Sequence, residues 1–208
     1  MILIGQYDSP FVRRVAVALR LYEMAYEHRP WSVFADADKI RAYSPLMRVP
    51  VLVTDSGMAL LDSGSIVDFL DGLAGERALI PASGVPRAKV LRVCALAMGL
   101  AEKGVSLVYE GVFHQHISAA WQERCTAQLL AALNALERKR SETTTPFWFG
   151  EDLTHADIAV ACAVRFLSEA HPAFVRSHLG PAVRAHFERC EGLDAFKSAY
   201  QPFYCSAA

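Results

Sequence analysis

The chain has 208 residues, with 21 lysines and arginines against 22 aspartates and glutamates, and 53% of its residues are hydrophobic. This length fits one domain or two small ones, and the apolar fraction is ample for a buried core, which argues against a large multidomain assembly and against global disorder. A net charge of -1 supplies no field for a polyphosphate backbone, so nucleic acid is a poor candidate partner.

Cysteine usage and apolar runs indicate the cellular compartment. The five cysteines are an odd number without a Cys-x-x-Cys pair, and Cys94 and Cys162 have the pattern of small buried apolar residues. The opening residues do not have the pattern of a secretory leader, and no apolar run reaches the roughly 20 residues of a membrane span. We therefore expect a soluble protein of the reducing cytoplasm, with no membrane partner.

Strand and helix patterns alternate in the first third of the chain. The expected order is a strand at 1–7, a helix from residue 10, a strand at 26–33, a short helix at 35–43, a hairpin at 49–61 and a helix at 63–73. Pro30 favours an edge position for the second strand. This alternation predicts a small mixed sheet with helices packed on its faces.

The strand signal ends at a segment rich in glycine and proline, 75–86, which has the composition of a linker. Beyond it, helical periodicity predicts helices at 87–111, 120–140, 156–170, 181–190 and 193–200. The sequence thus predicts an α/β domain at 1–78 followed by an all-helical domain at 87–208.

Ser9 stands before Pro10, where the first strand ends and the first helix begins. A hydroxyl at this turn lies at the positive end of the helix dipole, so it could help to stabilise an anion. The simpler interpretation is a helix cap, which is the commonest role of a serine before a proline at a helix start. The residues alone favour the cap.

Two further segments have features of a ligand site. Pro50 at the start of a strand can leave the N–H and C=O groups of Val49 free to pair with an extended peptide, although a trans proline beginning an edge strand is the commoner case. Ser63 before a helix can donate to a carboxylate, and Asp62 can attract an amine. A plain helix cap explains Ser63 equally well.

Taken together, these segments resemble the glutathione transferase superfamily, and the resemblance covers essentially the whole chain. Ser9-Pro10-Phe11-Val12-Arg13-Arg14-Val15 is similar to the catalytic Ser or Cys segment of bacterial and omega-like members. Val49-Pro50-Val51-Leu52 is similar to their cis-Pro loop, and Asp62-Ser63 to their acidic-Ser pair. Residues 150–158 are similar to the family's helix-capping motif, which Thr154 and Asp157 would close.

The resemblance implies a thioredoxin-like N-terminal domain that binds glutathione as co-substrate, and a helical C-terminal domain that lines the site for the second substrate. Glutathione would lie along Val49, whose bond to Pro50 would be cis, with its glutamyl carboxylate on Ser63. Ser9 would donate a hydrogen bond to the sulfur and lower the thiol pKa. Tyr7 is the rival for that role, because a phenol at the strand end can donate in the same way.

The resemblance also implies a homodimer and a small electrophilic or hydrophobic second substrate, with a pocket formed by Phe11, Tyr109 and Phe113. Omega-like relatives have Cys where this chain has Ser9, which favours conjugation or reduction over thiol exchange. Lys39 and Arg41 match only approximately the basic residue that meets the glycyl carboxylate in relatives. The alternatives are a non-enzymatic interaction protein on the same fold and a zeta-type isomerase, whose Ser-Ser-Cys-like run is missing here.

Other chemistries lack their motifs. The sequence contains no Gly-x-Ser-x-Gly, no Gly-x-Gly-x-x-Gly and no phosphate-loop Gly-Lys-Ser/Thr. His114 and His116 lie two residues apart with no third ligand at a suitable spacing, so we expect no metal site.

Overall fold

The computed structural model describes residues 1–205, which fall into two compact units. The first consists of Met1–Ala82 and Leu193–Tyr204, and the second is built from Ser83–Gly192. This division differs from the predicted 1–78 and 87–208, because Leu193–Tyr204 belongs to the first unit. A buried guanidinium explains the difference: Arg13 donates to the carbonyls of Phe196 at 3.0 Å and Ala199 at 2.8 Å.

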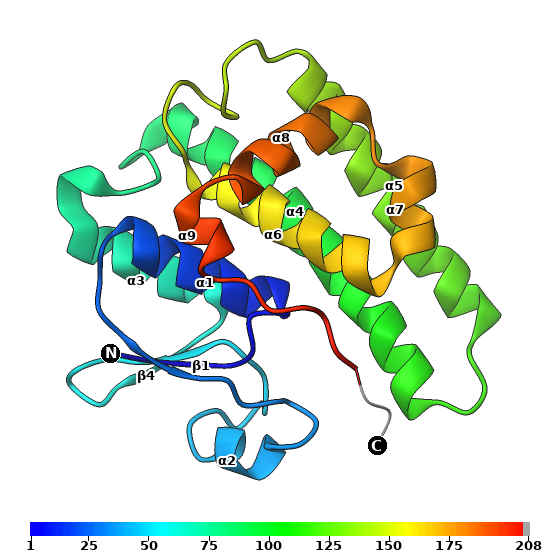
Figure 1. Ribbon diagram of the computed structural model, residues 1–208, viewed down its shortest axis with the longest axis horizontal. Helices are drawn as coiled ribbons and strands as arrows, with labels where there is room; N and C mark the ends of the chain where they lie inside the picture. The colour runs from blue at the N-terminus through cyan, green and yellow to red at the C-terminus, as the bar shows by residue number, and fades with distance from the viewer. Residues whose placement is uncertain (206–208) are drawn as a thin grey trace. The chain divides into compact units, whose positions relative to one another are not determined.

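The first unit contains a four-stranded sheet in the order β2-β1-β3-β4. Its strands are β1 (Ile2–Ile4), β2 (Glu27–Arg29), β3 (Val51–Val53) and β4 (Ala59–Leu61), with β1 parallel to β2 and antiparallel to β3. Helices α1 (Pro10–Leu21) and α3 (Ser63–Ala74) lie on one side of the sheet and α2 (Ala37–Arg41) on the other (Figure 1). The predicted order of elements is confirmed, as is the edge position of β2.

Both faces of the sheet are apolar, which explains why its central strands show continuous apolar runs instead of alternation. Ile4 packs with Ile40 of α2, whereas its neighbour Leu3 points to the opposite face and is also fully buried. A 3-10 turn (Gly75–Arg77) follows α3, and the short helix α9 (Asp194–Lys197) packs against α1.

The second unit is helical, as predicted. Its helices are α4 (Gly84–Phe113), α5 (Ala119–Ser141), α6 (His155–Ala170), α7 (Pro172–His178) and α8 (Pro181–Glu191). Helix α6 is buried over most of its length and packs against α4 and α8. Helix α7 was not expected from the sequence; Pro172 occupies its first turn, where a proline is tolerated. Within residues 1–205, no helix combines the length and the apolarity that crossing a membrane requires.

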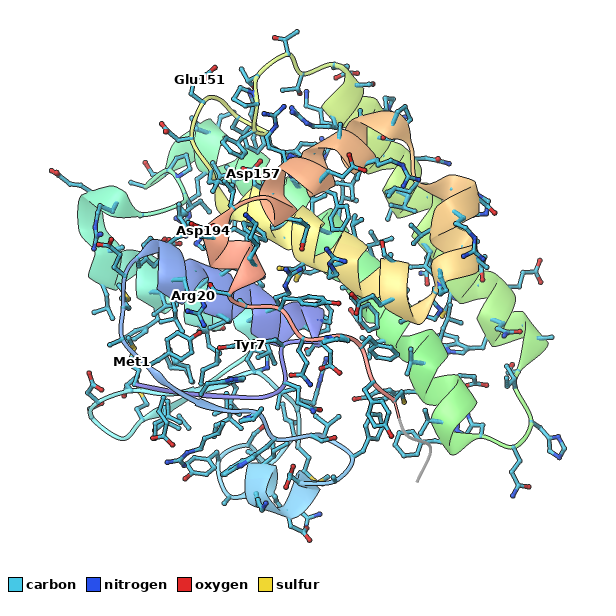
Figure 2. All side chains as sticks on the ribbon, in the orientation of Figure 1. Met1, Tyr7, Arg20, Glu151, Asp157 and Asp194 are labelled. Carbon is cyan, nitrogen blue, oxygen red and sulfur yellow. The ribbon has the colours of Figure 1, made fainter. Side chains whose placement is uncertain are left out.

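The start of α6 is closed as the sequence predicts. The Thr154 hydroxyl accepts from the N–H of Ala156, and one Asp157 carboxylate oxygen accepts from the N–H of Thr154 at 2.8 Å. The other carboxylate oxygen accepts from the N–H of Trp148 at 2.9 Å, which ties the preceding connection to the helix (Asp157 is labelled in Figure 2). Asp157 is fully buried.

His186 of α8 lies against this capping network. Its Nε2 is 3.8 Å from the Asp157 carboxylate and 3.5 Å from the Cys190 sulfur. Burial lowers the pKa of His186 to about 4, and the charge of Arg140 adds to this effect. The ring is therefore neutral at physiological pH, and its contact with Asp157 is not an ion pair there.

We expect the free energy of unfolding to fall by up to about 3 kcal/mol as the pH is lowered from about 6.5 to about 4. The unfolded chain takes up a proton at His186 near its ordinary pKa of 6.5, whereas the folded chain takes it up only near pH 4. Lowering the pH from about 6.5 to about 4 therefore favours the unfolded state. Burial raises the pKa of Asp157, which offsets part of the loss. Urea denaturation at a series of pH values measures the slope.

The control for this slope is an exposed histidine. His186→Gln should flatten the pH dependence, whereas His116→Gln, which changes an exposed side chain, should leave it unchanged. Equal slopes in the two variants would assign the acid sensitivity to other groups.

Candidate functional site

The topology of the sheet brings three segments to one end. Ile4, the last residue of β1, pairs with Val51, the first residue of β3, and Val51 also pairs with Leu61, the last residue of β4. The chain after β1, the chain before β3 and the chain after β4 therefore emerge together. These are the segments that carry Ser9, Val49-Pro50 and Asp62-Ser63.

Gly5 allows the segment after β1 to approach the segment before β3. Its φ is +126°, and a Cβ atom there would stand 2.5 Å from Val12 Cγ2 and 2.8 Å from Val49 Cβ. A glycine is needed both for the positive φ and for the close approach. The same residue thus brings the start of α1 next to the Val49 segment, a role that no local sequence pattern indicates.

Val49 presents an unpaired length of backbone. The Val49–Pro50 peptide bond is cis, as the resemblance implies. Within residues 1–205, no hydrogen bond uses the N–H or the C=O group of Val49. A donor and an acceptor on one extended residue can pair with a peptide that lies alongside it as an additional strand.

Asp62 caps α3, and Ser63 is its first residue. Oδ1 of Asp62 accepts from the N–H groups of Gly64 at 2.8 Å and Ser65 at 3.4 Å, which corrects the interpretation of Ser63 as the cap. Oδ2 has no hydrogen-bond partner within the described chain. Asp62 has a φ of +69°, which is uncommon for a residue with a side chain.

Ser63 is buried and accepts a hydrogen bond from Nη1 of Arg14 at 3.4 Å. Arg14 is itself buried on α1, so it holds the start of α3 against that helix. In the sequence, Arg14 stands out only as the second residue of a basic pair. Burial of an arginine on a helix is set by the neighbouring helix, so local sequence carries no signal for it.

Ser9 is the N-cap of α1, which is the interpretation that the residues alone favour. Its Oγ accepts from the N–H of Val12 at 3.4 Å, and its side chain is partly exposed. A hydroxyl that accepts through oxygen still carries its proton. No acceptor within residues 1–205 takes this proton, so the same hydroxyl can cap the helix and donate to a ligand.

Tyr7, the rival donor, has its hydroxyl 2.7 Å from the hydroxyl of Tyr26. Its ring stacks on His28, with centroids 3.9 Å apart and planes within 1°. Its hydroxyl lies beside Tyr26, in a pocket of the first unit that Ser9 does not line, whereas no acceptor in the described chain takes the Ser9 proton. This difference favours Ser9.

The other candidate residues belong to three different helices. Phe11 is half-buried in α1 of the first unit, whereas Tyr109 and Phe113 are exposed on α4 of the second and pack edge to face with centroids 5.6 Å apart. Their joint role as a second-substrate pocket stays a prediction. Lys39 and Arg41 are exposed on α2, where they pair with aspartates at 2.7 and 2.9 Å.

The histidine pair does not form a metal site in the described part of the chain. Nδ1 of His114 is 2.9 Å from a Glu110 carboxylate oxygen. Across residues 1–205, no group of three or more His, Cys, Asp or Glu side chains could hold a metal ion.

A mixed four-stranded sheet with helices on both sides, followed by a helical unit, defines a thioredoxin-like glutathione transferase fold. Family models agree: residues 3–78 match the N-terminal domain of glutathione S-transferases, and residues 119–189 match their C-terminal domain. The chain belongs to the glutathione S-transferase family.

Individual proteins show the same relationship. The chain is 29% identical over 173 residues to the uncharacterized GST-like protein YibF of Escherichia coli (strain K12), covering 81% of this chain and 82% of that protein. It is 28% identical over 174 residues to probable maleylacetoacetate isomerase 1 of Drosophila melanogaster, covering 79% of this chain and 68% of that protein. A glutathione S-transferase of Methylobacillus flagellatus KT, solved with glutathione bound, has a TM-score of 0.87 and 25% identity, covering 97% of this chain and 99% of that chain.

Proposed function

We propose that this chain is an enzyme that binds glutathione at the end of the sheet and uses Ser9 to activate its thiol. The observation that carries the proposal is the available proton on the Ser9 hydroxyl at the start of α1. A neutral donor aimed at sulfur stabilises the thiolate more than the thiol, so it lowers the thiol pKa. The positive end of the α1 dipole acts in the same direction.

The remaining groups fit the tripeptide. Its backbone pairs with the N–H and C=O groups of Val49, which make no other hydrogen bond in the described chain, beside Pro50. Its glutamyl carboxylate accepts from the Ser63 hydroxyl, whose oxygen already accepts from Arg14. Its glutamyl ammonium donates to Oδ2 of Asp62, which has no other partner within residues 1–205.

In the reaction we propose, glutathione releases its thiol proton to solvent and the thiolate attacks a small electrophilic substrate. In a conjugation, the sulfur electron pair forms a C–S bond and the leaving group departs with the electrons of the bond that breaks. Second-substrate binding at Phe11, Tyr109 and Phe113, assembly as a homodimer and a cytoplasmic location belong to the same proposal. Cys125 and Cys190, which are buried and form no disulfide, support a reducing compartment.

Ser63→Ala and Asp62→Ala should each weaken glutathione binding by about tenfold or more, because each removes a charge-assisted hydrogen bond worth on the order of 1.5 to 3 kcal/mol. Titration calorimetry measures the affinity directly. The matched control is Ser65→Ala, which removes an exposed hydroxyl from the same turn of α3. Unchanged affinity in both variants would place glutathione elsewhere.

A glutathione-dependent isomerase is the second candidate, favoured by the similarity to the probable Drosophila melanogaster isomerase. In that reaction a thiolate adds to a conjugated double bond and leaves again after rotation, so glutathione is regenerated. Measuring glutathione consumption distinguishes the two reactions, because conjugation consumes glutathione in proportion to product and the isomerisation does not. Binding without any turnover would instead favour a non-enzymatic interaction protein.

A further inference from the structure

The first unit contains a cavity of about 600 Å³ that is open to solvent. None of the four residues proposed to bind glutathione, Val49, Pro50, Asp62 and Ser63, lines it. Its walls come from the end of α1, the segment that leads into β2, and α9. Figure 2 labels three of the lining residues, Tyr7, Arg20 and Asp194, in this part of the unit. The volume lies within the range of about 300–1,000 Å³ typical of small-molecule sites.

The cavity holds one cation that is not neutralised. The Arg20 guanidinium lies over the ring of Tyr26, 5.8 Å from its centroid, and its Nε is buried without a hydrogen-bond partner. No carboxylate within residues 1–205 is at ion-pair distance from Arg20. The two acidic lining residues, Glu23 and Asp194, are each paired with another cation, and their side chains are 85% and 102% exposed.

A hydrogen-bond donor lies beside this cation. Tyr7 and Tyr26 have their hydroxyls 2.7 Å apart, and burial together with this bond raises the pKa of Tyr26, which therefore stays protonated at neutral pH. Two phenols carry two protons, and their mutual bond uses one. The second proton has no acceptor within the described chain.

His28 fixes the position of the phenol pair. Its Nε2 lies 2.8 Å from the Gly5 carbonyl, and because a carbonyl only accepts, Nε2 carries the proton. The ring held in this way stacks on Tyr7. The donor beside Arg20 is therefore preorganised, which reduces the entropy lost when a ligand binds.

We propose that this cavity binds a small organic carboxylate with an apolar body. The carboxylate lies between the Arg20 guanidinium, whose planar array of donors suits it, and the remaining phenolic O–H. The apolar body lies against Met24 and Ala195, which line the same cavity. The site is separate from the proposed glutathione site, so both ligands bind at once.

Equilibrium dialysis with 2-naphthoate, compared with the uncharged 2-naphthamide, tests the proposal. Wild-type protein should bind the carboxylate about tenfold or more tightly than the amide, and Arg20→Gln should abolish that preference. Arg92→Gln makes the same change of charge at an exposed position outside the cavity and should bind as wild type does. Equal binding of 2-naphthoate by wild type and Arg20→Gln would overturn the proposal.

Two further measurements separate this site from the glutathione site and from effects on folding. Saturating glutathione should not displace 2-naphthoate, and Ser63→Ala should bind it normally; displacement would place the carboxylate in the glutathione site and overturn the proposal. Ala195→Trp fills the cavity from α9 and leaves Arg20 in place. If Arg20→Gln does not fold, retained binding in Ala195→Trp contradicts the proposal and lost binding supports it.

Discussion

Replacing Ser9 by alanine should lower kcat/KM at neutral pH by about 10- to 100-fold. A neutral donor to a charged sulfur contributes on the order of 1.5 to 3 kcal/mol, which corresponds to about one to two pKa units of the bound thiol. The acid limb of the pH–rate profile should therefore move to higher pH by that amount. At pH values above both thiol pKa values the two rates should converge, because the thiolate then forms without help.

Binding at low pH distinguishes activation from a general loss of the site. The protonated thiol gains little from the Ser9 donor, so glutathione affinity at low pH should be nearly unchanged in Ser9→Ala. Ser9→Thr keeps a hydroxyl at the cap and is the matched control. A rate that falls equally in Ser9→Thr and Ser9→Ala would mean that the hydroxyl is not the group that matters.

Replacing Gly5 by alanine should destabilise the protein by roughly 2 to 6 kcal/mol, the sum of backbone strain and overpacking. The φ of +126° is unfavourable for alanine, and the new Cβ would collide with side-chain carbons of Val12 and Val49 at 2.5 and 2.8 Å. Urea denaturation measures the loss. Relief of the collision moves α1 away from the Val49 segment, so glutathione affinity should fall as well.

The Gly57→Ala variant separates the effect of backbone strain from the effect of overpacking. Gly57, in the hairpin turn, also has a positive φ, +83°, but a Cβ atom added there would have no neighbour within 4 Å, so only the strain applies. We expect a loss of roughly 1 to 3 kcal/mol there, with glutathione binding unchanged. If Gly5→Ala costs no more than Gly57→Ala, the close approach at Gly5 does not hold the site together.

Local sequence patterns predict the elements of this chain well, because their signals are local. Ser9 and Pro10 start a helix wherever they precede an apolar periodic run, and Gly57 supplies the positive φ of a hairpin turn. Thr154 and Asp157 close α6 through bonds that span three residues. Each of these features is specified within a few positions of the residue that shows it.

The features that local sequence does not reveal depend on contacts between distant segments. The position of Leu193–Tyr204 depends on the carbonyls that accept from Arg13, more than 180 residues away in the chain. The burial of Arg14 against Ser63 joins α1 to α3, and the collision around Gly5 exists only once β1 and β3 pair. The grouping of Ser9, Val49 and Ser63 at one end of the sheet was therefore predictable only from the resemblance to a family.

The most direct test of the proposed mechanism is the ultraviolet absorbance of the thiolate of bound glutathione, measured as a function of pH. With wild-type protein, the pKa should lie below the value of roughly 8.5 of an ordinary cysteine thiol, and in Ser9→Ala it should be higher by about one to two units. If the two titrations overlay, Ser9 is only a helix cap, and another group, with Tyr7 the first to test, activates the thiol.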